Sequence, residues 1–274
     1  MNIERAYFTN GVEKAVDELA GEVIRFTKGT GAYGGVVGLS GGIDSTATAY
    51  LCDYAFRREG SGLGLYGIVM PSSVNDDADK EDGLKVARNL GIESVVVSIE
   101  PIAEMFVRHV PGIEGDLHRG NLYSEVRAIV LSRIAASKNY RVMGTGNRDE
   151  DYVLGYCTKR GDGAVDNNVL GNLPKRLVRE LATHLGVSED LVNRVPTAGL
   201  WDGQTDEGEL GYTYDEAELI QNGFDQGYNA MQIRDITGSK EKTIADVVRR
   251  HVSTEHKRRV PSVGKVNLSY EVAR

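Results

Sequence analysis

The segment Ser40–Ser45 combines residue types that could bind a phosphate chain together with a metal ion. It follows the apolar run Val36–Leu39 and precedes a stretch with helical register, so it occupies a turn between a strand and a helix. Gly41 and Gly42 permit a tight turn in which backbone N–H groups and the N-terminus of the new helix face one anion. A carboxylate beside bound phosphates makes sense only if it holds a divalent cation, so Asp44 is a candidate metal ligand.

The full string Ser-Gly-Gly-Ile-Asp-Ser is more specific than a pair of turn glycines. It resembles the pyrophosphate loop of the ATP pyrophosphatases, which cleave ATP between its α and β phosphates to adenylate a substrate. Transfer of the γ phosphate by a P-loop is disfavoured, because no Gly-x-x-x-x-Gly-Lys-Ser/Thr string occurs. Two Gly-x-Gly-x-x-Gly strings, which begin at Gly29 and Gly62, precede strands instead of following them, so we interpret them as loop glycines.

The composition indicates a globular protein with one large α/β domain. The chain has 274 residues, 41% of them hydrophobic, and a net charge of -8. This acidic balance argues against a broad nucleic-acid-binding surface. Cys52 and Cys157 lack metal-ligand spacing and suit a reducing compartment. Neither a signal peptide nor an apolar run of about 18 residues occurs, so we expect a cytoplasmic protein without a membrane segment.

The hydrophobic pattern predicts strands that alternate with helices, which is typical of a parallel sheet. The predicted strands are Val36–Leu39, Leu63–Met70, Ser94–Ile99 and Tyr140–Gly144. The predicted helices cover residues 10–28, 43–58, 74–90, a long stretch after Gly120, and later segments from Pro174, Val187, Tyr214 and Thr243. Ligands bind at the carboxyl ends of strands in such sheets, so the loops at residues 40–45 and 145–151 should face the same crevice. The Gly-rich segment Thr158–Asp166 is predicted to be a mobile active-site loop.

Several segments together resemble the ammonia-dependent NAD synthetase family, in the same order and at nearly the same spacing. They are Gly-Leu-Ser-Gly-Gly-Ile-Asp-Ser, Gly-Thr-Gly-Asn, Thr-Lys-Arg-Gly-Asp-Gly-Ala-Val-Asp, Leu-Pro-Lys, Pro-Thr-Ala-Gly-Leu and Thr-Glu-His-Lys-Arg. Members of that family adenylate deamido-NAD with ATP and let ammonia displace AMP, which gives NAD. The resemblance implies a ligase that uses ATP and Mg²⁺ and forms a homodimer. It also implies a doubly wound, mainly parallel five-stranded sheet of the adenine nucleotide α-hydrolase-like type, with helices on both faces.

The resemblance extends to domain organisation. Glutamine-using relatives carry an additional N-terminal hydrolase domain, and only some thirty-five residues precede the phosphate loop here. We therefore expect residues 1–274 to form a single domain without a glutaminase domain, supplied with free ammonia or with ammonia from a separate partner.

The resemblance also implies roles for individual residues. The ATP-binding residues would be Gly38, Leu39, Ser40, Gly41, Gly42, Ile43, Asp44, Ser45, Thr145, Lys175 and Thr197. The residues that bind deamido-NAD would be Arg127, Lys159, Asp166, His256 and Lys257. Asp44 would bind Mg²⁺ with Glu150. Counting back from Lys159 points instead to Asp151, because this loop is one residue longer than in the family, so the second metal ligand stays open between these neighbours. Lys175 would neutralise charge on the phosphates, and we hypothesise that Asp166 helps to deprotonate ammonium.

One position departs from the family pattern. The helix after Gly120-Asn121 usually carries two arginines two residues apart, and here Glu125 occupies the first place while Arg127 occupies the second. Loss of a cation and gain of a like charge should weaken binding of an anionic substrate by more than about 1 kcal/mol unless Arg127 substitutes. The alternatives are a ligase that amidates a different carboxylic acid, a tRNA-modifying adenylating enzyme, and a nucleotide-sensing module without turnover.

Overall fold

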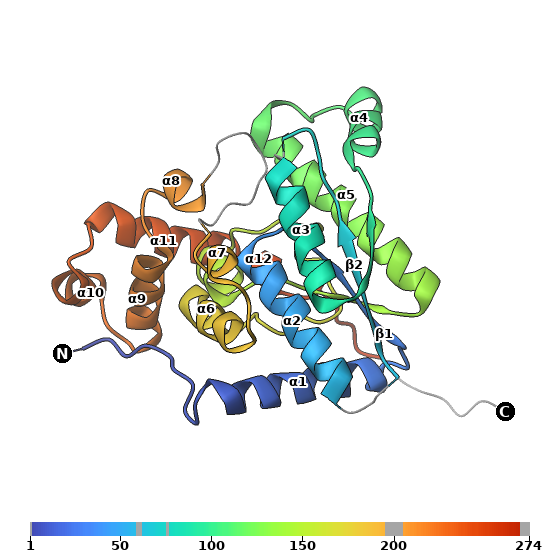
Figure 1. The fold of residues 1–274 in the computed structure, drawn as a ribbon. Coiled ribbons are helices and arrows are strands. Elements are labelled where there is room, and N and C mark those ends of the chain that lie inside the picture. The colour runs from blue at the N-terminus through green and yellow to red at the C-terminus, as the bar shows by residue number, and fades with distance from the viewer. Residues whose placement is uncertain (1, 59–61, 75–76, 195–204, 269–274) are drawn as a thin grey trace.

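A four-stranded parallel sheet lies at the centre of the molecule, with strand order β3-β2-β1-β4 (Figure 1). This computed structural model describes residues 2–58, 62–74, 77–194 and 205–268. The strands are β1 (Gly34–Gly38), β2 (Gly64–Val69), β3 (Glu93–Val96) and β4 (Arg141–Met143). The chain adds β2 and β3 on one side of β1 and then crosses to add β4 on the other side. The switch point between β1 and β4 is where ligands bind in sheets of this kind.

The expectation of a fifth strand is wrong for the described residues, in which the sheet has only four strands. At the free edge of β4, Met143 forms an isolated parallel bridge with Asn167. The Asp166 carboxylate accepts a hydrogen bond from the Val142 backbone N–H at 2.8 Å, and so occupies a donor that a fifth strand would use. Asp and Asn compete with strand pairing through such side-chain bonds, which explains why the Asp-Asn-Asn sequence ends the sheet here.

Helices cover both faces of the sheet, as predicted. The helical elements are α1 (Val12–Gly29), α2 (Ile43–Arg58), α3 (Asp77–Leu90), α4 (Glu100–His109), α5 (Gly115–Lys138), η1 (Asp149–Leu154), α6 (Lys175–His184), α7 (Glu189–Val192), α8 (Asp206–Leu210), α9 (Tyr214–Asp225), α10 (Ala230–Thr237), α11 (Glu241–Ser253) and α12 (Glu255–Arg258). The pattern had not indicated α4 or α10 as separate helices. No helix in the described part of the chain is long and apolar enough to cross a membrane.

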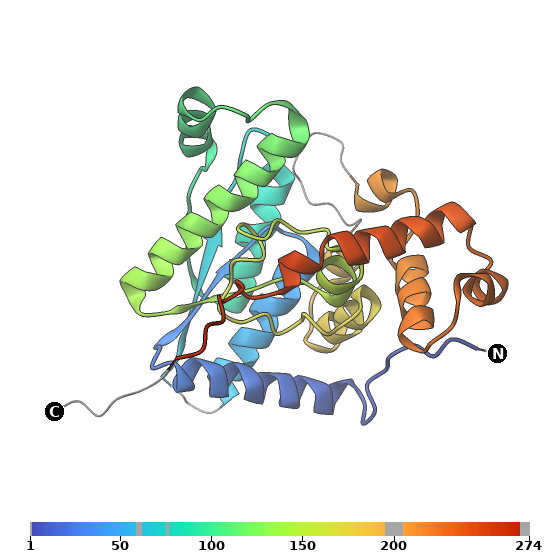
Figure 2. The ribbon, with the colours of Figure 1, turned by 180° about the vertical axis from the view of Figure 1, so that it is seen from behind.

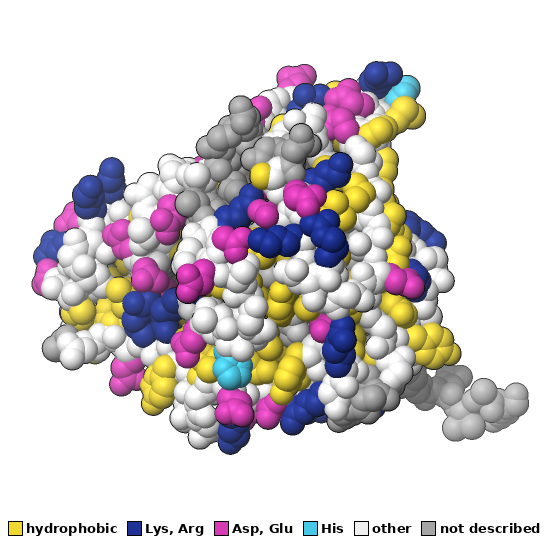
Figure 3. Space-filling view, in the orientation of Figure 1, with side chains coloured by type: hydrophobic (Ala, Val, Ile, Leu, Met, Phe, Trp, Pro, Cys, Tyr) yellow, Lys and Arg dark blue, Asp and Glu magenta, His cyan; other side chains and the backbone are white. Residues whose placement is uncertain are grey.

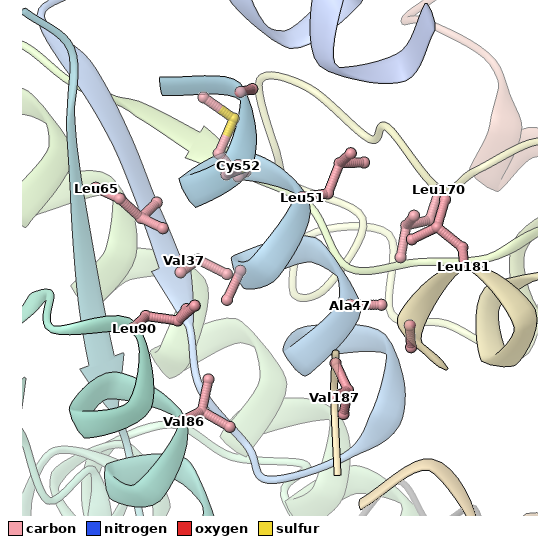
Figure 4. Packing of buried hydrophobic residues seen from close by; sticks show 14 of the residues in the cluster. Val37, Ala47, Leu51, Cys52, Leu65, Val86, Leu90, Leu170, Leu181 and Val187 are labelled. Atoms are coloured by element: carbon pink, nitrogen blue, oxygen red, sulfur yellow. The ribbon is translucent and has the colours of Figure 1, made fainter. Parts of the chain in front are cut away.

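The largest hydrophobic cluster lies between the sheet and a layer formed by α1, α2, α3, α6 and α7. Helix α2 is the centre of this layer, because its small residues Ala47 and Ala49 and its larger Leu51 are all fully buried. Figure 4 shows Leu51 between the sheet side, where Val37 lies, and Leu181 of α6. A second cluster joins the opposite face of the sheet to α4 and α5. The packing of α2 on both sides fixes the turn at its N-terminus.

The C-terminal helices form a third hydrophobic cluster beside the sheet (Figures 1 and 2). It contains Val153 and Leu154 of η1 together with Ala217 of α9, Ile233 of α10 and Val247 of α11, all fully buried. The cluster therefore anchors η1, the helix that follows β4, from the side away from the sheet. This anchoring matters because η1 carries the acidic residues that the sequence places in the site.

Candidate functional site

A cavity of about 600 Å³ opens at the carboxyl ends of the central strands, as the topology predicts. Its lining combines the loop after β1 with the loop after β4 and with the N-terminus of α6. The described residues of the predicted ATP site that line it are Gly38, Leu39, Ser40, Gly42, Ile43, Asp44, Ser45, Thr145, Glu150 and Lys175. Segments that lie more than 100 residues apart in the sequence therefore meet at one cavity.

Lys175 forms the centre of the site, because its ammonium lies between two carboxylates. Its Nζ is 2.6 Å from Asp44 Oδ2 and 2.6 Å from Glu150 Oε1. The lysine side chain is only 4% exposed, and the side chains of Asp44 and Glu150 are 16% and 19% exposed. An ion pair shielded from water to this degree is screened far less than a surface pair. The three side chains come from α2, η1 and α6, so the pair also connects these elements.

Hydrogen bonds involving Asn147 and Asp149 hold the segments that carry these charged groups. Pro174 lies directly before the first residue of α6, and the Lys175 N–H donates to Asp149 Oδ2 at 2.8 Å. The Asn147 amide donates to Asp44 Oδ1 at 3.0 Å, while its carbonyl oxygen accepts from the backbone N–H groups of Asp149 and Glu150 at 3.0 Å each. Asn147 is fully buried, so it acts as a rigid spacer between the two loops.

The conformation of η1 decides which acidic neighbour enters the site. The segment is a π-helix, which accommodates an extra residue within a helical turn. This agrees with the additional residue that the motif spacing indicated between Thr145 and Lys159. Glu150 contacts Lys175, whereas the Asp151 carboxylate accepts a hydrogen bond from Asn168 Nδ2 at 2.9 Å. The geometry therefore favours Glu150 over Asp151 as the partner of Asp44.

Burial shifts the pKa values of the charged groups in the site. Burial alone lowers the pKa of Lys175, but the carboxylates of Asp44 and Glu150 outweigh it and hold the pKa above its ordinary value. Burial raises the pKa of Glu150, and the Lys175 ammonium opposes this shift. Burial also raises the pKa of Asp149 to about 7, in part offset by the hydrogen bond from the Lys175 backbone. Perturbed pKa values in a cavity are typical of functional sites.

The Asp44 and Glu150 carboxylates fit a magnesium ion that also contacts substrate phosphates. Mg²⁺ is commonly held in proteins by one or two carboxylates, with phosphate oxygens and water completing its coordination. Within the described ranges, no group of three or more His, Cys, Asp or Glu side chains could hold a metal alone. The lysine ammonium already acts as a stand-in cation, because it lies at hydrogen-bond distance from one oxygen of each carboxylate.

Arg194 is a part of the site that the sequence did not reveal. Its Nη1 donates to Asp82 Oδ2 at 2.6 Å and to the Gly41 carbonyl at 3.3 Å, and its Nη2 pairs with Asp79. Gly41 has a φ of +79°, and a Cβ there would lie 2.8 Å from the Asp82 Cβ. The phosphate loop is thus clamped against α3 by an arginine more than 150 residues away. Such a contact has no signature in local sequence spacing.

A second cavity, of about 560 Å³, adjoins the first and contains the residue that departs from the family pattern. Glu125 lines it together with His118, Lys159 and Lys257. Lys257 lines both cavities, and its Nζ donates to the carbonyls of Gly155 at 2.8 Å and Cys157 at 2.6 Å. Glu125, Lys159 and Lys257 are acidic and basic side chains in the lining of this second cavity.

Two further residues predicted to bind the substrate, Arg127 and Lys159, line different cavities. Arg127 lines the first cavity, donates to the Met70 carbonyl at 3.2 Å, and has its pKa lowered to about 10 by burial. Lys159 donates to the backbone carbonyls of His256 and of Arg259, so it connects the loop at residues 158–166 to the C-terminal segment. That loop contains neither helix nor strand, as expected.

Three described residues of the predicted site, Gly41, Asp166 and His256, line neither cavity. Asp166 is exposed and bonded to the edge of β4, and it does not line either cavity. Its catalytic role therefore stays a prediction that this geometry does not support. His256 is also exposed, and its Nδ1 lies 3.2 Å from the Ser253 carbonyl. Thr197 lies outside the described residues.

Comparison with known proteins places this site in a defined context. A family model described as NAD synthase matches residues 13–261. The NH(3)-dependent NAD(+) synthetase of Methanococcoides burtonii is 39% identical over 238 residues, which cover 86% of this chain and 89% of the relative. Among solved structures, the NMN synthetase from Francisella tularensis superposes with a TM-score of 0.80 at 32% identity, covering 93% of this chain and 99% of that chain. The NH3-dependent NAD synthetase from Campylobacter jejuni has the same fold, with a TM-score of 0.75 at 24% identity and coverage of 93% and 99%.

Proposed function

The chain belongs to the NAD synthase family, and we propose that it amidates deamido-NAD with ammonia at the expense of ATP. It is accordingly a ligase that forms a carbon–nitrogen bond. The observation that best supports the chemistry is the convergence of Asp44, Glu150 and Lys175 beneath the phosphate loop. This arrangement suits a triphosphate with its cation. Adenylation of a carboxylate needs no protein nucleophile, so positioned charges are sufficient for it. Family membership also leaves the tRNA-modifying and nucleotide-sensing alternatives without support.

The reaction proceeds in two balanced steps. An oxygen of the substrate carboxylate attacks the α phosphorus of ATP, and pyrophosphate leaves with the electron pair of the broken P–O bond. Ammonia then attacks the acyl carbon and loses one proton, and AMP leaves with the former carboxylate oxygen. Because a carboxylate is a poor acyl donor, the first step creates the leaving group that the second step requires.

The residues of this chain contribute position and charge. The loop at residues 40–45 orients the phosphates at the N-terminus of α2, and Lys175 offers a cation to the departing pyrophosphate. Arg194 holds Gly41, and therefore the loop, against α3. Asp44 and Glu150 would hold Mg²⁺, which supplies neutralisation of negative charge on the phosphate oxygens. Orientation and electrostatic stabilisation of this kind account for catalysis without a covalent enzyme intermediate.

The second cavity is the proposed place of the acid substrate. It shares Asn121, Cys157, Thr158 and Lys257 with the ATP cavity, so a carboxylate bound there can reach the α phosphate. Lys257 and Lys159 provide positive charge at this boundary. Arg127 lines the ATP cavity. It is the cation closest in sequence to Glu125, which occupies the place of the arginine that the family usually carries.

A second candidate substrate is a smaller pyridine mononucleotide acid, and Glu125 favours it. Glu125 lines the second cavity, where it would repel an additional phosphate of a dinucleotide. The solved NMN synthetase of Francisella tularensis, which is similar over nearly its whole length, shows that this fold accommodates a mononucleotide reaction. A competition assay with equal amounts of deamido-NAD and nicotinate mononucleotide separates the two candidates by the ratio of their kcat/KM values.

We also propose that the protein is a cytoplasmic homodimer that takes free ammonia and that its NAD synthetase region forms one domain. Ile102 and Met105 of α4 are exposed apolar side chains that line neither cavity, and such side chains suit a contact with a second subunit. Among the described residues on the face in Figure 3, Lys and Arg side chains are interspersed with Asp and Glu, which does not favour a nucleic-acid partner. Light scattering after gel filtration gives the mass that tests the dimer.

The proposed function is tested with purified protein, ATP, Mg²⁺, ammonium and deamido-NAD. We expect NAD, AMP and pyrophosphate to form in equal amounts, and we expect no AMP when the acid is omitted. Release of ADP instead of AMP would contradict adenylation. AMP without NAD, while another acid is converted to its amide, would contradict the assignment of the substrate.

A further inference from the structure

We propose that the Lys175 ammonium occupies the metal position until ATP arrives, so that the divalent cation and the nucleotide enter the site together. The inference rests on the proposed function for the identity of the nucleotide and the metal. It goes beyond that function because it assigns to Lys175 a role in the ATP-free protein. The role is to exclude the metal from a preformed pair of carboxylates.

The distances make the lysine and a metal mutually exclusive at this point. Lys175 Nζ is 2.6 Å from one oxygen of Asp44 and 2.6 Å from one oxygen of Glu150. Mg²⁺ binds oxygen at about 2.0–2.1 Å, so an ion shared by the same two oxygens would overlap the ammonium. The other oxygen of Asp44 accepts a hydrogen bond from Asn147 at 3.0 Å, so one of its two lone pairs is already used.

The structure also indicates which part of the lysine can move. Its backbone is fixed at the start of α6 by the bond from its N–H to Asp149 Oδ2 at 2.8 Å. Its ammonium lies 5.2 Å from the centre of the Tyr214 ring, a contact that a cation keeps over a range of positions. Lys175 lines the ATP cavity together with the phosphate loop, so a short rotation of the chain end exchanges the carboxylates for phosphate oxygens.

A thermodynamic consequence follows from this exchange. Without ATP, a divalent cation must displace the ammonium from both carboxylates and leave it buried without an anion. With ATP, the phosphates supply that anion, so the cost disappears and the two ligands bind with positive coupling. The ATP-free enzyme should therefore have a low affinity for divalent cations, although both predicted metal ligands are already in position.

The test measures Mn²⁺ binding to the full chain without nucleotide, by electron paramagnetic resonance of the free ion. We compare the wild type with Lys175→Met and with Lys85→Met, a control in which an exposed lysine loses its ion pair to Asp190. We expect Lys175→Met to bind one Mn²⁺ about tenfold or more tightly than the wild type, a size typical of coupling between sites. Lys85→Met should match the wild type. Adding Asp44→Asn to Lys175→Met should abolish the gain.

Several outcomes would overturn the inference. Equal affinities of the wild type and Lys175→Met would show that the ammonium does not exclude the metal. A gain that survives Asp44→Asn would place the metal elsewhere. The wild type keeps the test decisive if Lys175→Met does not fold, because tight stoichiometric Mn²⁺ binding to the ATP-free wild type would by itself contradict the inference. Turnover is not needed for any of these measurements, so their failure is distinct from failure of the wild type to form NAD.

Discussion

The adjacent carboxylates Glu150 and Asp151 allow a matched test of the site geometry. Each can be neutralised with almost no change in shape, by Glu150→Gln and by Asp151→Asn. Glu150 Oε1 lies 2.6 Å from Lys175 Nζ, whereas Asp151 bonds to the Asn168 amide. We expect Glu150→Gln to impair the reaction severely and Asp151→Asn to have a much smaller effect, because only the first residue contacts the catalytic cation.

The magnitude follows from the contact itself. The gross attraction of unit charges 2.6 Å apart is about 6 kcal/mol at an effective dielectric constant near 20, and this is an upper limit. The net value of a hydrogen bond to a charged group is about 1.5–3 kcal/mol. Since about 1.4 kcal/mol corresponds to tenfold in rate, Glu150→Gln should lower kcat/KM for ATP by roughly ten- to a hundredfold. Loss of a metal ligand adds to this effect and places the expected loss at the upper end.

Pyrophosphate release in the presence of ATP, Mg²⁺, deamido-NAD and ammonium is the appropriate assay, because ammonium allows turnover and pyrophosphate leaves in the adenylation step. Circular dichroism and a urea unfolding curve establish that both variants are folded. Asp151→Asn should keep kcat/KM within about threefold of the wild type, since it removes one neutral-to-charged hydrogen bond outside the ion pair. A loss in Asp151→Asn as large as that in Glu150→Gln would refute the assignment of Glu150 over Asp151.

Three further predictions concern neighbouring residues. Asp149 has a folded-state pKa of about 7, above its ordinary 3.8, so the folded protein binds this proton more tightly than the unfolded chain and loses stability as pH rises from about 4 to about 7. As pH rises from 5 to 7, the free energy of unfolding of Asp149→Asn should therefore increase by up to about 2 kcal/mol relative to that of the wild type, as measured by urea unfolding. A difference in unfolding free energy that does not depend on pH would contradict a buried, protonated carboxyl. Arg194→Met should raise KM for ATP by about tenfold, because Gly41 loses the hydrogen bond that holds it against α3. The exposed control Arg88→Met should leave KM unchanged. An unchanged KM in both variants would show that the hydrogen bond to Gly41 is dispensable. Glu125→Arg should increase the preference for deamido-NAD over nicotinate mononucleotide, read from the ratio of kcat/KM values, and an unchanged ratio would remove Glu125 from substrate selection.

The sequence was sufficient to predict the strand, turn and helix around residues 40–45, because their signals are local. The apolar run, the glycine turn and the helix register at residues 36–51 appear as β1, its loop and α2. The rule that ligands meet at the carboxyl ends of strands correctly brought Thr145 and Glu150 to the same cavity as Ser40. The motif spacing also detected an additional residue before Lys159, which the structure accommodates as a π-helix.

Other features depended on contacts between distant segments, which spacing does not encode. Arg194 reaches Gly41 and two carboxylates of α3 only after the chain has folded. The fifth strand was expected from the resemblance, but at the edge of β4 the Asp166 side chain takes the backbone donor of Val142 and only an isolated bridge forms. Asp166 is bonded to the edge of β4 and lines neither cavity.

The central claim, that this site activates a carboxylate by adenylation, is tested most directly by isotope transfer. Deamido-NAD labelled with ¹⁸O in its carboxylate is incubated with the protein, ATP, Mg²⁺ and ammonium, and the phosphorus-containing products are analysed by mass spectrometry. Since AMP leaves with a former carboxylate oxygen, we predict one ¹⁸O atom in each AMP released and none in pyrophosphate. Appearance of ¹⁸O in inorganic phosphate, with ADP as the other product, would contradict the account.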